Sequence, residues 1–188
     1  MFFESYGPSP DFLEFPGCTL RDHTCITMRF LKIAVMEPNP GDVERLLFIM
    51  ANLPEFLRLS LASRKLHELI SMNKLERLPV ILQVIRCLYS LEASMIERLV
   101  TSWIKEMCKL DSKILTELMV TYCEAFLNEE RFINIYSGTF LDGYNSLKED
   151  EQERIMIGLK EGLLLSPSRL DLLEKLPEAI KILMGLRK

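Results

Sequence analysis

The sequence has few of the residues from which enzyme active sites are usually built. Only two histidines, His23 and His67, occur among its 188 residues, although histidine is the usual group for proton transfer near neutral pH. Neither follows a glutamate by three positions, so the Glu-x-x-His motif of di-iron helical bundles is missing. No Gly-x-Gly-x-x-Gly and no Gly-Lys-Ser/Thr phosphate loop occurs either. We therefore identify no catalytic residue and expect no cofactor.

Long apolar runs and closely paired cysteines are also missing. No uncharged apolar run approaches the roughly 20 residues that span a bilayer, and the first residues lack the basic and apolar regions of a signal peptide. The five cysteines include no Cys-x-x-Cys pair, and their odd number indicates free thiols in a reducing compartment. We therefore expect a cytoplasmic protein that does not insert into membranes.

The chain has no excess of basic residues. Lysines and arginines number 23 against 27 aspartates and glutamates, so the net charge is −4. Nucleic-acid binding depends on clustered basic side chains that face phosphates. The nearest approach to a cluster combines Arg64 and Lys65 with Lys74 and Arg77. We therefore do not expect nucleic acid as a partner, and a nucleic-acid-binding regulator is the last of our alternatives.

One short segment combines side chains that can bind a metal. Cys18, Asp22, His23 and Cys25 lie close together, and thiolate, imidazole and carboxylate groups all coordinate zinc or iron. The Cys-x4-His-x-Cys spacing matches no standard site, and no second ligand cluster lies nearby in the sequence. Cys18, His23 and Cys25 are therefore weak candidates for metal ligands, and a histidine beside two partly buried thiols is the simpler interpretation.

Aromatic residues are concentrated at the N-terminus, among prolines and glycines that interrupt regular structure. Such a density of rings is not typical of a disordered tail. We predict an irregular arm over residues 1–40 that packs its rings on the body of the protein or on another subunit. Residues 20–36 within it fit either a short helix or a strand. The aromatic interface candidates are Phe2, Phe3, Tyr6, Phe12 and Phe15.

Beyond the arm, apolar residues recur at helical spacing. We predict a domain of about eight helices over residues 41–188. Residues 78–91 are apolar almost all round, which predicts a central helix. Residues 93–109 are amphipathic. The polar residues off their apolar stripe are Glu97, Arg98, Ser102, Lys105, Glu106 and Lys109.

Consecutive helices pair into units that begin near residues 42, 78, 112 and 147. The spacing of about 35 residues is the length of a helix-turn-helix repeat. The signature residues of tetratricopeptide and ankyrin repeats are absent. We therefore predict an all-α fold in which helical hairpins stack as a short α-solenoid-like array. A compact irregular helical bundle would give the same periodicity and remains the alternative.

A Leu-Pro step precedes an apolar helical pattern at three places, Pro54, Pro79 and Pro177. Proline suits the first turn of a helix because the N–H group that it lacks has no partner there. The two most similar copies are not separated by a multiple of the unit length. We interpret the step as a device that starts helices and not as a repeat signature.

Two glycines and one loop are further candidates for binding. Gly158 and Gly162 lie four positions apart in a predicted helix, where each costs up to about 1 kcal/mol relative to alanine. Close packing inside the domain, a homodimer interface or a ligand cavity would compensate that cost, so both are interface candidates. Residues 137–145 are predicted to be non-helical, and loops on a rigid scaffold often carry function. The candidates in this loop are Phe140, Asp142 and Tyr144.

These patterns favour a non-catalytic protein-interaction or scaffold module. Apolar residues make up 48% of the chain, enough for both a helical core and an apolar surface of the kind that marks interfaces. We expect a protein partner or a homo-oligomer. The alternative is a helical enzyme or small-ligand-binding domain whose site forms only in three dimensions.

Overall fold

The structure, a computed structural model, describes residues 39–186. These residues form nine helices and contain no strand, which confirms the predicted all-α fold. Nearly all of the predicted arm lies outside the described residues, so its helix or strand and its aromatic candidates stay predictions. The helices are α2 (Pro40–Asn52), α3 (Glu55–Ser71), α4 (Lys74–Leu88), α5 (Ala93–Met107), α6 (Ser112–Asn128), α7 (Glu130–Asn145), α8 (Glu149–Leu165), α9 (Arg169–Lys175) and α10 (Glu178–Leu183).

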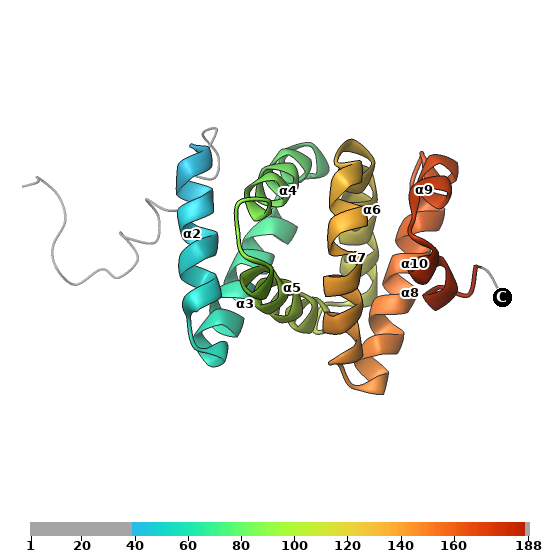
Figure 1. Cartoon of the computed structure of the whole chain (residues 1–188). Coiled ribbons are helices and arrows are strands. Elements are labelled where there is room, and N and C mark those ends of the chain that lie inside the picture. The colour runs from blue at the N-terminus through green and yellow to red at the C-terminus, as the bar shows by residue number, and fades with distance from the viewer. Residues whose placement is uncertain (1–38, 187–188) are drawn as a thin grey trace, which may run out of the picture. The chain divides into compact units, whose positions relative to one another are not determined.

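Helices that are two apart in the sequence pack against each other. In one row α2 contacts α4, α4 contacts α6 and α6 contacts α8, while α3, α5 and α7 form a second row. Figure 1 shows the described helices following one another from α2 at one end to α8, α9 and α10 at the other. The first helices of successive pairs begin at residues 40, 74, 112 and 149, close to the predicted unit starts. The solenoid-like array itself stays a prediction.

Polar side chains also join helices that are two apart in the sequence. Lys74 Nζ lies 2.5 Å from Glu124 Oε1, which joins α4 to α6. Thr116 donates a hydrogen bond of 2.6 Å to Glu161 Oε2, which joins α6 to α8. The partners are 50 and 45 positions apart in the chain. The separations are similar because α4 meets α6 and α6 meets α8, in each case the helix two places further on.

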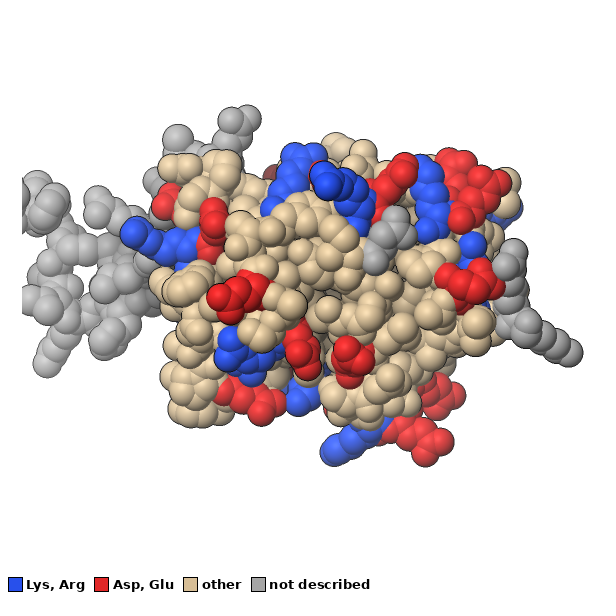
Figure 2. Space-filling view, viewed as in Figure 1, with Lys and Arg blue, Asp and Glu red and all other residues tan. Residues whose placement is uncertain are grey.

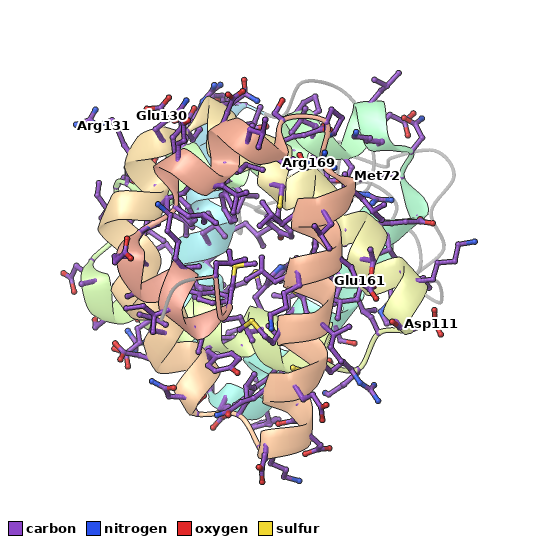
Figure 3. The ribbon with its side chains drawn as sticks, turned by 90° about the vertical axis from the view of Figure 1, so that its right-hand side faces the viewer. Met72, Asp111, Glu130, Arg131, Glu161 and Arg169 are labelled. Atoms are coloured by element: carbon purple, nitrogen blue, oxygen red, sulfur yellow. The ribbon has the colours of Figure 1, made fainter. Side chains whose placement is uncertain are left out.

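Apolar side chains fill the space between the rows. Burial of a leucine or isoleucine stabilises a fold by roughly 1.5–3 kcal/mol. Figure 3, viewed from the end of α8–α10, shows side chains filling the interior, while Asp111, Glu130, Arg131 and Glu161 lie at the periphery. Large side chains with at most 1% exposure include Leu66, Leu115, Leu118, Ile155 and Leu172.

Buried arginines close the carboxyl ends of the first two described helices. Arg58 of α3 donates from Nη1 to the carbonyl oxygen of Leu53, which follows α2, over 2.9 Å. Arg77 of α4 donates from Nη2 to the carbonyl oxygen of Met72, which follows α3, over 2.9 Å, and from Nε to that of Leu69 over 3.2 Å. The last carbonyls of a helix lack hydrogen-bond donors within the helix, and these guanidinium groups supply such donors.

The Leu-Pro steps start two helices, but the prediction for the third is wrong. Pro54 and Pro177 are the residues immediately before α3 and α10. Pro79 lies inside α4, which begins five residues earlier, at Lys74. The Asn73 side chain accepts hydrogen bonds from the backbone of Leu75 and Glu76, so a strong local cap sets the start of the helix. The cap outweighs the proline. The N–H group that Pro79 lacks would have donated to a carbonyl in the first turn of the helix, so only one hydrogen bond is lost.

The predicted non-helical stretch at residues 137–145 is also wrong. These residues continue α7 without a break to Asn145. Gly138 and Gly143 suggested an interruption, because glycine weakens an isolated helix. Gly143 instead permits close packing, since a Cβ there would lie 3.3 Å from Thr101 Oγ1 of α5. Packing of α7 against α5 supplies the stability that local propensity lacks.

Candidate functional site

The candidates predicted in residues 137–145 do not form a binding loop. The rings of Phe140 and Tyr144 stack on α7 with centroids 6.4 Å apart. Tyr144 is 9% exposed and belongs to the main core, while Asp142 is exposed. The three side chains therefore divide between the core and the surface of one helix instead of converging on a ligand.

Gly158 and Gly162 lie on the face of α8 that packs against α6. A Cβ at Gly158 would lie 2.8 Å from Leu115 Cγ, and one at Gly162 would lie 2.5 Å from Met119 Cβ. Both glycines are buried. Packing inside the chain therefore accounts for their spacing without a second copy or a ligand.

The candidate metal ligands Cys18, His23 and Cys25 lie outside the described residues. Within residues 39–186, no group of three or more histidine, cysteine, aspartate or glutamate side chains is placed to hold a metal ion. That stretch also contains no helix both long and apolar enough to cross a membrane.

The described thiols are unsuited to act as nucleophiles. Cys87, Cys108 and Cys123 are free and buried. Burial raises the pKa of Cys108 and that of Cys123 to about 12, and burial likewise raises the pKa of Cys87. Because the thiolate is the reactive form, these three thiols are inert at neutral pH.

The predicted basic cluster does not form a patch. Arg77 is buried and bound to backbone carbonyls. Lys74 pairs with Glu124, and Lys65 pairs with Glu68 at 2.7 Å. On the face shown in Figure 2, basic and acidic side chains alternate around a broad band of uncharged residues. No extended basic surface faces outward there, as phosphate binding would need.

Large apolar side chains are exposed where α2 turns into α3. We call the four side chains Phe48, Ile49, Phe56 and Leu57 the apolar corner. Their exposed fractions are 51%, 50%, 70% and 43%. They flank the two-residue connection at residues 53–54. Two of these side chains are phenylalanine rings, which are thus open to solvent.

A shallow depression lies beside the corner, between α3 and α5. Its volume is about 440 Å³ and it is open to solvent. We call it the α3–α5 depression. Phe56 precedes Ser60 by one helical turn, so this corner residue and the depression share one face of α3. The residues that line the depression are Leu59, Ser60, Ser63, Arg64, His67, Glu106 and Lys109.

Glu106 is the unusual member of this lining. Its side chain is only 4% exposed, and Oε1 lies 2.5 Å from Nζ of Lys109, whose side chain is 63% exposed. A carboxylate can accept about four hydrogen bonds, and the ammonium group of Lys109 supplies one of them. A buried carboxylate is costly unless it is paired and hydrogen-bonded. Glu106 therefore offers an acceptor to whatever enters the depression.

His67 contributes a second acceptor. Its Nδ1 lies 2.7 Å from the carbonyl oxygen of Ser63. Since a carbonyl can only accept, Nδ1 carries the proton in this contact, and Nε2 is an acceptor when the ring is uncharged.

The burial of Glu106 could not be predicted from the sequence, because its position lies off the apolar stripe of α5. The pairing of α3 with α5 is what buries it.

Comparison of this chain with protein-family models, curated proteins and solved structures found no match.

Proposed function

We propose that this chain is a non-catalytic protein-interaction module, built as a short α-solenoid-like array, which binds its partner at the apolar corner. The observation that carries the proposal is the exposure of Phe56 and its neighbours at the start of α3. Aromatic side chains, phenylalanine included, are enriched in the cores of protein interfaces. Clusters of large apolar side chains at a surface mark interaction sites.

The packing of each helix from α2 to α6 on the helix two places further on supports the array. In helical arrays the terminal units usually carry a polar outer face, which keeps them soluble. Here α2 and α3 expose the apolar corner, and the last turn of α8 and the start of α9 expose Leu164, Leu165 and Leu170 by 65–69%. Of these two groups, only the apolar corner includes phenylalanine rings, which are enriched in the cores of protein interfaces.

The shape of the α3–α5 depression favours a protein partner over a small molecule. Small-ligand pockets enclose most of the ligand surface, whereas this depression is open. An open depression beside exposed phenylalanines suits the side chains of a protein lying across α3. A helical enzyme finds no support in the buried, neutral thiols.

The proposal is tested with two matched double variants of the full chain. Phe56→Ser with Leu57→Ser removes half of the apolar corner, and Leu164→Ser with Leu170→Ser removes exposed leucines at the other end. Substitutions at such exposed positions change stability little. We expect the wild type to bind a second copy or a discrete partner, and the first variant to lose at least about tenfold in affinity while the second keeps it.

Light scattering measures self-association, and pulldown followed by titration of the captured, purified protein measures the affinity for a partner. A strictly monomeric chain that captures no protein would contradict the proposal. So would binding that both double variants keep equally.

A further inference from the structure

We infer that the α3–α5 depression takes a basic side chain, a lysine ammonium or an arginine guanidinium, from a protein segment whose apolar side chain lies on the apolar corner. The inference rests on the proposed function and specifies the chemistry of the partner. It starts from Glu106, a carboxylate that is 4% exposed and yet faces an open depression.

The chain itself shows which group Glu106 accepts. The ammonium group of Lys109 lies 2.5 Å from Oε1, so the carboxylate already binds a primary ammonium ion. Lys109 can be exchanged, because its side chain is 63% exposed and an incoming ammonium ion keeps the buried carboxylate paired. An ammonium group from a partner can therefore replace it at small cost.

The other groups in the depression are compatible with a donor. The hydroxyl oxygens of Ser60 and Ser63 accept hydrogen bonds, and Nε2 of His67 does so when the ring is uncharged. Arg64 is the one further cation in the lining, and its Nε lies 4.0 Å from a carboxylate oxygen of Glu68, which also pairs with Lys65 at 2.7 Å. An anionic ligand would meet Arg64 and Lys109 but would also face the buried carboxylate of Glu106.

The same face of α3 sets the spacing of the two contacts. Phe56, Ser60, Ser63 and His67 follow one another at helical spacing, with Phe56 70% exposed. From Phe56 to Ser63 the helix rises roughly 10 Å, at 1.5 Å per residue. An extended segment spans roughly the same distance in three residues. A partner with an apolar residue and a basic residue three positions later matches both contacts.

The test uses the isotope-labelled full chain and three short peptides, followed by nuclear magnetic resonance titration. The probes are acetyl-Phe-Ala-Ala-Lys-amide and the same peptide with glutamate or norleucine in place of lysine. We expect the lysine peptide to bind tightest and to shift the backbone signals of Ser60, Ser63, His67 and Glu106. Tighter binding of the glutamate peptide would overturn the inference, as would the absence of binding by any of the three.

Three variants separate the role of Glu106 from general effects. Glu106→Gln should weaken binding of the lysine peptide about tenfold, because it removes a charged acceptor. Lys109→Gln should tighten binding about twofold, because it removes the competing ammonium. Lys105→Gln is the control, since Lys105 lies on the same helix and pairs with Glu55 at 2.9 Å outside the lining of the depression. Thermal melts confirm that each variant is folded.

Equal binding by the wild type and Glu106→Gln, or weaker binding by Lys109→Gln, would contradict the inference. If the Phe56 and Leu57 variant still loses its partner in that case, the interaction surface stands without a basic anchor. If that variant keeps its partner, the proposed function itself fails.

Discussion

At the scale of single residues, polar side chains in the interior decide how helices join. Arg58 is 9% exposed and Arg77 is 7% exposed. Both donate to backbone carbonyls at the ends of neighbouring helices. Arg58 also donates from Nε to Ser102 Oγ over 2.7 Å, which links α3 to α5. These residues therefore serve helix packing, and charge counts from the sequence overstate the basic surface.

Replacement of Arg77 by methionine should lower the free energy of unfolding by about 2–4 kcal/mol. The change keeps an apolar stem but leaves buried carbonyls at the end of α3 without their donor. Urea denaturation measures the effect. Arg86→Met is the control, because Arg86 is 63% exposed and its pair with Glu129 lies at the surface, where a pair contributes at most about 1 kcal/mol. Equal losses in the two variants would contradict the role of Arg77.

Iodoacetamide at pH 8 should label Cys108 and Cys123 only when the chain unfolds. Burial raises the pKa of both thiols to about 12 from an ordinary 9.0, so neither ionises in the folded chain at that pH. As the pH rises above about 9, these thiols ionise in the unfolded chain before they ionise in the folded chain. The free energy of unfolding therefore falls as the pH rises from about 9 to about 12. Peptide mapping by mass spectrometry with and without urea measures labelling. Rapid labelling of either thiol in the native protein would disprove its burial.

At the scale of helices, local signals and tertiary packing account for different parts of the structure. Caps and amphipathic stripes are local, so the helix starting at Ser112 could be predicted from the sequence. Gly143 and Pro79 are misleading for the same reason. Each weakens a helix in isolation, whereas α7 and α4 are held by α5 and by the cap at Asn73 respectively. The cap at Asn73 is itself a local signal, whereas no local pattern contains the packing of α7 on α5.

The glycines of α7 and α8 should respond in opposite ways to alanine. At Gly138 a Cβ meets nothing within 4 Å, so Gly138→Ala should raise the free energy of unfolding by up to about 1 kcal/mol. At Gly162 a Cβ would lie 2.5 Å from Met119 Cβ, so Gly162→Ala should cost about 1–3 kcal/mol. Urea denaturation measures both. A loss of stability in Gly138→Ala would contradict the continuous α7.

At the scale of the whole described domain, two rows of helices leave a particular surface open. The sequence allowed an apolar surface in general terms, through its high apolar fraction. It did not indicate where, because Phe56 and Leu57 follow the same helical periodicity as buried residues. Only the pairing of α3 with α5 shows which of its faces is covered. The site therefore depends on contacts between helices that no single segment encodes.

Glu106 is a second residue whose surroundings could not be predicted from the sequence. Its position in α5 is polar by periodicity, yet the side chain is 4% exposed because α3 lies beside it. The depression, its buried carboxylate and the neighbouring phenylalanines exist only once both helices are placed. These features together define the surface that we assign to a partner.

The most direct test of this assignment is photo-crosslinking in the full chain, with p-benzoylphenylalanine placed at position 56 or at position 170. Both native side chains are exposed to nearly the same extent, 70% and 69%, so the two probes differ only in location. We predict a discrete crosslinked protein product, a second copy or a partner identified by mass spectrometry, from position 56 and not from position 170. Equal products from both positions, or none from position 56, would contradict an interaction surface at the start of α3.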